Sequence, residues 1–93
     1  MKNKEKSLLI TDCLMLEIAN GKEDAFCTLC NNTYKLVYNY IFSIVRNHTL
    51  AEDLLHNTYI SVKAAISQYK PNNKPMAWIF TIARNNAYNY FNK

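Results

Sequence analysis

The chain has 93 residues, which is enough for one small domain and leaves little room for a second core. Hydrophobic residues make up 49% of it, and a single glycine with two prolines leaves few tight turns, so the composition favours helices over a sheet. A net charge of +4 and a pI near 9.0 fit a nucleic-acid partner without demanding one.

The N-terminal residues 1–8 are basic and are expected to form a disordered tail. The apolar run that follows them breaks at Thr11 and Asp12, which makes it a poor signal peptide. No apolar run approaches the ~20 residues that span a bilayer. We therefore expect a cytoplasmic protein with no membrane insertion.

A first helix is predicted over residues 12–19. Ile10, Leu14 and Ile18 face inward in this prediction, because they recur at spacings of four. Gly21 is expected to end the helix, since glycine tolerates the left-handed conformation that follows many helices.

A second, long helix is predicted over residues 22–46. Asn31, Asn32 and Thr33 are poor helix formers and predict a bend near its middle. Its apolar side chains recur at threes and fours and are Phe26, Leu29, Val37, Tyr40, Ile41, Ile44 and Val45.

Three cysteines give no disulfide framework. Cys27 and Cys30 form a CxxC, which suggests either a redox pair or half of a zinc site. No second CxxC or HxxxH completes a tetrahedral set, and Cys13, His48 and His56 are scattered. The favoured interpretation is reduced, metal-free thiols that pack as small helix residues, with no metal site and no cofactor.

The third helix is predicted over residues 50–68. Its start carries the sequence "TLAE", a capping box in which Thr49 accepts from the Glu52 amide and Glu52 reaches back. The predicted core stripe consists of Leu55, Thr58, Tyr59, Val62 and Ile66.

The opposite face of this helix carries Asp53, His56, Asn57 and Ile60 at i, i+3, i+4 and i+7. One aliphatic side chain among polar groups is typical of a protein-docking surface. A solvated face with one stray isoleucine explains the pattern equally well, so composition alone leaves both interpretations open.

The sequence "YKPNNKP" predicts an exposed, fairly stiff loop. A fourth helix over residues 75–92 follows it, with Pro75 in the first turn, where its missing N–H costs nothing. The whole chain is therefore predicted to be one all-α domain, a compact bundle of about four helices.

The fourth helix carries two apolar stripes, although a helix that packs on one core needs only one. One side combines Trp78, Ile79, Ile82, Ala83, Asn86 and Tyr90. The other side combines Phe80, Arg84, Tyr88 and Phe91.

Two segments of the chain, "AEDLLHNTYISVKAAISQYKP" and "AWIFTIARNNAYNYF", resemble region 2 of bacterial extracytoplasmic-function (ECF) sigma factors of the sigma-70 family. That family typically shows an A-E-D-[LIV]-x-Q-[DE]-[TV]-[FY] helix, a polar loop and a W-[LI]-[FY]-x-I-A-[RK]-N helix. The resemblance covers roughly residues 12–92. The matching residues are Ala51, Glu52, Asp53, Leu54, Thr58, Tyr59, Trp78, Ile79, Phe80, Ile82, Ala83, Arg84 and Asn85.

Three positions depart from the family pattern. His56 and Asn57 replace the usual glutamine and acidic residue, and Asn89 replaces an acidic residue after "RN". Family members also carry a second helical domain with a helix-turn-helix, and the sequence ends before such a domain is reached.

The resemblance implies a transcription-initiation function with two partners. In the family the third helix docks on a coiled coil of the largest RNA polymerase subunit, which assigns Asp53, His56, Asn57 and Ile60 to polymerase binding. The loop and the fourth helix read and help melt the minus-ten promoter element. This assigns DNA binding to Lys70, Asn72, Asn73, Lys74, Arg84, Asn85 and Tyr88. An anti-sigma factor is a further expected partner.

The resemblance also divides the two stripes of the fourth helix. Ile79, Ile82 and Ala83 are expected to pack on the second and third helices, and Trp78 to pack at the edge of the same stripe. Arg84 and Tyr88 are expected to face DNA. Phe80 and Phe91 are expected to pack on the first helix, because exposing both would leave a large apolar patch.

Three other classes compete with this interpretation. An enzyme is disfavoured because the sequence offers no Ser/His/Asp set, no paired carboxylates on one face and no phosphate loop. A helical interaction module, such as a sigma-like decoy or an anti-sigma-binding fragment that does not read DNA, is opposed only by the loop and Arg84. A helix-turn-helix repressor fits "YKPNNKP" poorly.

Overall fold

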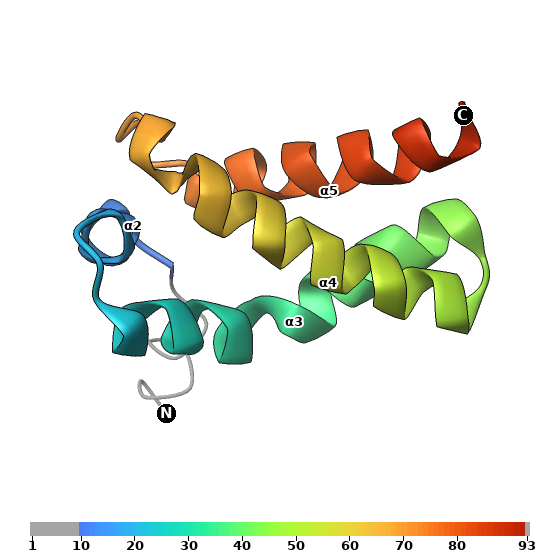
Figure 1. Cartoon of the computed structure of the whole chain (residues 1–93), viewed down its shortest axis with the longest axis horizontal. Helices are drawn as coiled ribbons and strands as arrows, with labels where there is room; N and C mark the ends of the chain where they lie inside the picture. Colours follow the sequence, from blue (N-terminus) through green and yellow to red (C-terminus); the bar gives the residue numbers. More distant parts are fainter. Residues whose placement is uncertain (1–9, 93) are drawn as a thin grey trace.

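A computed structural model describes residues 10–92, so the predicted N-terminal tail lies outside the described residues. These residues form α2 (Asp12–Ala19), α3 (Glu23–Val45), α4 (His48–Ala65), the short 3₁₀ helix η1 (Ile66–Gln68) and α5 (Pro75–Phe91). Figure 1 shows α5 lying over α4, and α2 placed near the start of α3. The predicted all-α bundle is confirmed, with bounds within two or three residues of the expected ones.

Helix α2 ends in a Schellman motif at Gly21. The Gly21 N–H donates to the Ile18 carbonyl at 2.9 Å, and the Lys22 N–H donates to the Glu17 carbonyl at 3.1 Å. Gly21 adopts φ 91°, a conformation that costs glycine little. The predicted stop is therefore confirmed.

The buried face of α2 differs by one position from the prediction. Ile10 and Ile18 are buried as expected, but Leu14 is half-buried and its neighbour Met15 is fully buried. An eight-residue helix presents little more than two turns, so α3 and η1, which contact it, decide which side is covered.

Helix α3 is continuous over 23 residues, although its two halves point in different directions in Figure 1. Near the change of direction, the buried Thr33 hydroxyl donates to the Leu29 carbonyl at 2.7 Å. Such a bond back to residue i−4 often bends a helix. The bend expected at this point is therefore present without a break in the helix.

The start of α4 corrects the predicted capping box. Asn47 is the N-cap, and its side-chain oxygen accepts from the Leu50 N–H at 2.8 Å. Thr49 consequently lies inside the first turn rather than before it. Asparagine caps at least as well as threonine, and the left-handed Arg46 (φ 55°) turns the chain so that Asn47 reaches the cap position first.

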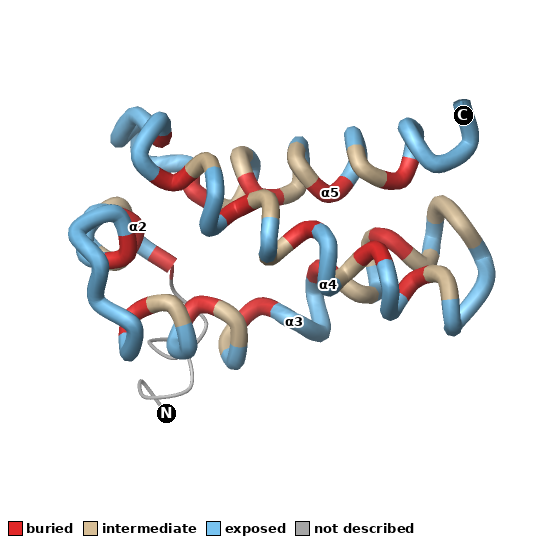
Figure 2. The backbone as a smooth tube through the Cα atoms, viewed as in Figure 1, coloured by how far each residue is buried: buried red, intermediate tan, exposed pale blue. Residues whose placement is uncertain are grey.

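The core is formed where α3, α4 and α5 meet, and Figure 2 shows their buried positions facing one another. The predicted stripe of α4 is confirmed at Thr58, Val62 and Ile66, which are buried. Leu55 and Tyr59 are only half-buried, and Ala51 and Leu54 complete the buried face in their place. The fully buried side chains of the domain include Met15, Leu29, Thr33, Val37, Ile41, Thr58, Val62 and Ile79.

Helix α5 packs on both α3 and α4, as predicted for its first stripe. Ile79 and Ala83 are fully buried and Ile82 is half-buried. Trp78 contacts the core and meets the Tyr69 ring edge-on with centroids 5.1 Å apart, which confirms its packing role.

Two aromatic predictions for α5 are wrong. Phe80 packs on Tyr40 of α3, with ring centroids 4.9 Å apart, and not on the first helix. Phe91 is 55% exposed, and its ring meets the neighbouring Tyr90 ring edge-on. Tyr90, on the side of the first stripe, is also exposed. The C-terminal end of α5 lies at the opposite end of the bundle from α2 in Figure 1, so Phe91 cannot reach it.

Candidate functional site

All four residues of the predicted docking face are exposed on α4. Asp53, His56, Asn57 and Ile60 lie opposite the buried stripe of that helix. Ile60 is 60% exposed, the largest exposed fraction among the exposed large hydrophobic residues of the described part of the chain. The structure therefore places an unusually open aliphatic side chain within a polar helix face.

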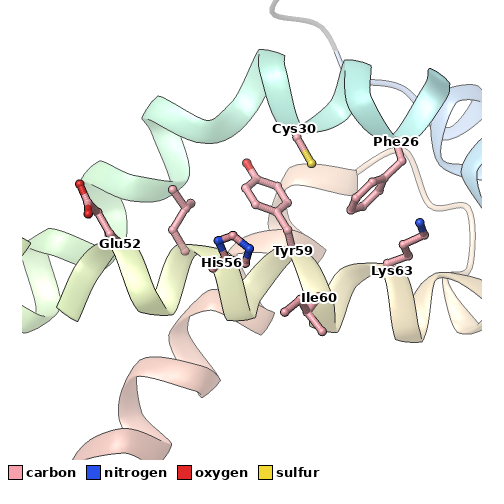
Figure 3. A pocket seen from close by; sticks show the side chains of 8 residues that line it. Phe26, Cys30, Glu52, His56, Tyr59, Ile60 and Lys63 are labelled. Atoms are coloured by element: carbon pink, nitrogen blue, oxygen red, sulfur yellow. The ribbon is translucent and has the colours of Figure 1, made fainter. Parts of the chain in front are cut away.

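A groove between α3 and α4 borders this face. Its volume is about 520 Å³. His56 and Ile60 line it, whereas Asp53 and Asn57 do not. Its other lining residues, which the sequence prediction missed, are Phe26 and Cys30 of α3 and Glu52, Leu55, Tyr59 and Lys63 of α4. In Figure 3 Phe26 and Cys30 of α3 face Lys63 and Tyr59 of α4 across the groove, whereas Ile60 points away from α3.

The floor of the groove is held by contacts between the two helices. The Tyr59 hydroxyl lies 2.6 Å from the Thr33 hydroxyl, and the Lys63 Nζ lies 5.0 Å from the centre of the Phe26 ring. Burial raises the pKa of Tyr59 to about 12, so its hydroxyl stays protonated at neutral pH. The groove therefore combines an uncharged tyrosine and apolar side chains with two charged lining residues, Glu52 and Lys63.

The CxxC lies on α3, with Cys27 exposed and Cys30 half-buried beside the groove. Burial, followed by the nearby Cys27, raises the pKa of the Cys30 thiol, which disfavours the reactive thiolate. Both cysteines are free, and residues 10–92 contain no cluster of three His, Cys, Asp or Glu side chains suited to a metal ion. Reduced, metal-free thiols remain our prediction.

The exposed face of α5 carries the predicted DNA residues in one stripe. Arg84, Asn85 and Tyr88 are all exposed. Ala77 and Thr81, also exposed, continue the same stripe toward the loop at spacings of three and four. The sequence prediction missed these two small residues, although their spacing from Arg84 and Asn85 would have indicated them.

The loop of residues 70–74 is exposed throughout, as predicted. It leads directly into α5, where Pro75 occupies the first turn. The Asn72 side-chain oxygen accepts from the Lys74 N–H at 3.0 Å, and Asn73 adopts a left-handed φ of 65°. The loop is therefore folded by its own polar groups.

A contact with the start of α2 also holds the loop. The two carboxylate oxygens of Asp12 accept from different donors: Oδ1 from the Tyr69 hydroxyl, and Oδ2 from the Asn73 N–H at 2.8 Å. Burial, followed by the hydrogen bond and charge of Asp12, raises the pKa of Tyr69 to about 12, so the hydroxyl stays a donor. No local sequence pattern joins residues about 60 positions apart.

These surfaces belong to an all-α domain. Its helix α4 exposes a polar face centred on Ile60, a basic, asparagine-rich loop follows, and α5 exposes a stripe that contains Arg84. The family model described as Sigma-70 region 2 matches residues 29–93. The chain belongs to the sigma-70 region 2 family, and the relatives it matches include ECF sigma factors.

Curated relatives agree with this family. The chain is 37% identical over 73 residues to the RNA polymerase sigma factor CarQ of Myxococcus xanthus, which covers 78% of this chain and 42% of CarQ. It is 30% identical over 77 residues to the ECF RNA polymerase sigma factor SigK of Mycobacterium sp. (strain KMS), covering 82% of this chain and 40% of SigK.

The ECF RNA polymerase sigma factor SigX of Bacillus subtilis is 28% identical over 71 residues, covering 76% of this chain and 37% of SigX. The chain thus spans about two fifths of the length of these relatives. No solved structure matches the chain at a comparable level of significance. Among residues 10–92, none of the helices combines the length and apolar character needed to cross a bilayer.

Proposed function

We propose that this domain binds core RNA polymerase through the outward face of α4 and reads the non-template strand of the minus-ten element through residues 70–74 and α5. The polymerase surface is centred on Ile60, with Asp53, His56 and Asn57 around it. The largest-subunit coiled coil is the expected partner, which places the domain in the bacterial cytoplasm.

The exposure of Ile60 supports the docking half of the proposal. A docking surface commonly has one well-packed apolar anchor surrounded by polar contacts that exclude water. The groove beside Ile60 gives a partner helix a second place to insert an apolar side chain. His56 and Asn57, which replace the usual family residues, are both exposed here and would meet the partner directly.

The exposed stripe of α5 supports the DNA half. Arginine pairs with guanine edges or phosphate, asparagine pairs with adenine, and a tyrosine ring stacks on a base. Arg84 lies nine residues after Pro75, so it is about 14 Å farther along the helix axis, a distance that about four stacked nucleotides span. One strand lying along α5 would therefore reach both the loop and Arg84.

Single-stranded DNA is the form that such a surface can read. Bases inside a duplex are paired and stacked, and taking one out of the stack costs a few kcal/mol. Stacking on an aromatic side chain returns about 1–3 kcal/mol per base. Lys70 and Lys74 add phosphate attraction that carries no sequence information.

The observation that carries the proposal is the division of α5 into two faces. Ile79, Ala83 and Ala87 are fully buried, while Arg84, Asn85 and Tyr88 are exposed on the other side. The core accounts for the first stripe and for Phe80 of the second, and the exposed Arg84, Asn85 and Tyr88 are available to a partner.

A selection experiment tests the proposal. A bacterial core RNA polymerase carrying this chain is mixed with a pool of random single strands, and the bound strands are sequenced. We expect one sequence motif to be enriched relative to the strands recovered with core polymerase alone. A strand that carries this motif is called the selected strand below. Arg84→Ala should lose the enrichment, because one base-reading contact supplies about 1–3 kcal/mol of discrimination.

Lysine variants should behave differently from Arg84→Ala. Lys70→Ala and Lys74→Ala should keep the motif but weaken binding to every strand, each reducing the slope of log affinity against log salt by about 0.7. Lys35→Ala, an exposed lysine on α3, is the matched control and should leave affinity and slope unchanged. No enriched motif with the wild-type chain on core polymerase would favour the interaction module that does not read DNA.

An anti-sigma factor is a further proposed partner. A protein that keeps this domain from polymerase has to cover the Ile60 face or its neighbouring groove. Competition between such a protein and core polymerase for the wild-type chain would test this arrangement.

A further inference from the structure

The contact between Asp12 and the loop joins two parts of the chain that otherwise have no common role. Asp12 is the first residue of α2, and the loop lies 57 to 61 residues farther along the sequence. We define the Asp12 clamp as Asp12, Tyr69 and Asn73.

Two members of the clamp, Asp12 and Tyr69, are supported by their surroundings. Asp12 is half-buried in the first turn of α2, where the helix dipole favours a carboxylate. Tyr69 is 7% exposed and its ring packs edge-on against Trp78. The carboxylate and the tyrosine therefore form a fixed support behind a loop whose other residues are exposed.

The clamp uses the backbone of Asn73 and leaves its side chain available. The Asn73 N–H is bound to Asp12, whereas its side chain is exposed and makes no hydrogen bond within the described residues. The left-handed φ of 65° is a conformation that asparagine tolerates better than most residues. A charged acceptor makes this N–H bond stronger than a neutral one.

We infer that Asp12 is a positioning residue for DNA recognition: its carboxylate holds the backbone of residues 70–74 in one conformation, so that Asn72 and Asn73 meet a base in a fixed orientation. This inference rests on the proposed DNA function. It predicts that Asp12 affects the choice of base without contacting DNA and without affecting polymerase binding.

The nearly isosteric variant Asp12→Asn tests the carboxylate. An asparagine offers one oxygen and one NH₂ group, so it can serve only one of the two donors, and its NH₂ would face the other donor. With the loop released, the ratio of affinities for the selected and a scrambled strand should fall about tenfold, equivalent to 1.4 kcal/mol. Affinity for the scrambled strand and for core polymerase should stay at the wild-type level.

Three further variants distinguish the effect of the loop contact from the general effect of changing an aspartate in the first turn of a helix. Asp24→Asn changes a first-turn aspartate of α3 and should leave the ratio unchanged. Tyr69→Phe keeps the ring against Trp78, removes one donor and should give a smaller loss than Asp12→Asn. Asn73→Gly keeps the N–H and the left-handed backbone but removes the side chain, so it should lose base choice while the clamp stays intact.

The Asn73 amide gives a readout of the clamp that does not depend on DNA. Its NMR signal should shift and its hydrogen exchange should accelerate in Asp12→Asn, but not in Asp24→Asn. Anisotropy on the selected and scrambled strands is then measured for each variant bound to core polymerase.

The outcomes separate the clamp from the proposed function. If the wild-type chain shows no strand preference, the DNA function itself fails. If the wild type prefers the selected strand and Asp12→Asn keeps the full ratio, the clamp has no positioning role. Should Asp12→Asn fail to fold, a wild-type ratio in Tyr69→Phe would overturn the inference in the same way.

Discussion

Ile60→Glu should abolish the binding of this domain to core RNA polymerase while leaving its fold intact. Ile60 is 60% exposed, so a glutamate at this position disturbs no packed core. In a docked complex the same side chain would be an unpaired buried charge. Loss of a central anchor costs about 2 kcal/mol or more, roughly a thirtyfold loss of affinity.

The matched control for this change is Leu36→Glu. Leu36 is a 49% exposed aliphatic residue on α3, and it does not line the groove beside Ile60. The Leu36→Glu variant should bind core polymerase as tightly as the wild type. Circular dichroism reports the helix content of both variants. Normal polymerase binding by folded Ile60→Glu would place the docking surface elsewhere on the domain.

Ile79→Ala should destabilise the domain more than any change on its functional faces. Ile79 is fully buried where α5 packs on α3 and α4. Removing a buried isoleucine side chain down to alanine costs about 2–5 kcal/mol, a large part of the 5–15 kcal/mol by which a typical domain is stable. The melting temperature should fall by about 10 °C or more.

Ile60→Ala provides the comparison, because it makes the same chemical change at an exposed position. Its stability should stay within about 0.5 kcal/mol of the wild type. Thermal and urea unfolding followed by circular dichroism measure both variants. Equal losses at the two positions would contradict the burial of Ile79 on α5 and the exposure of Ile60 on α4.

Local signals in the sequence predicted the helices well. The spacing of apolar residues gave the four helices, Gly21 ended the first one, and Pro75 began the last. These features act over a few residues, so the chain needs no tertiary information to express them. At the start of α4 the capping-box pattern predicted Thr49 as the N-cap, whereas the structure uses Asn47, a residue type that caps equally well.

The wrong predictions concern positions whose burial or contacts are decided by tertiary packing. Phe91 lies beyond the reach of the first helix because of where α2 sits in the bundle, which no helical spacing indicates. Met15 replaces Leu14 in the core for the same reason. The Asp12–Asn73 contact depends on a loop that returns to the start of the chain after about 60 residues.

The functional faces were predicted by a combination of spacing and family resemblance. Helical spacing grouped Asp53, His56, Asn57 and Ile60, and the structure exposes all four. The groove was not predictable in this way, because Phe26 and Lys63 belong to different helices and meet only after folding.

DNA reading by the loop and α5 is tested most directly by measuring the affinity of this domain for the selected strand, its duplex and a scrambled strand. Fluorescence anisotropy at low salt compares the selected strand, the same sequence as duplex, and a scrambled strand. The single strand should bind most tightly, since the duplex carries an unpairing cost of a few kcal/mol and the scrambled strand lacks the bases that Asn72, Asn73 and Arg84 meet. Equal affinity for all three forms would contradict DNA reading by the loop and α5.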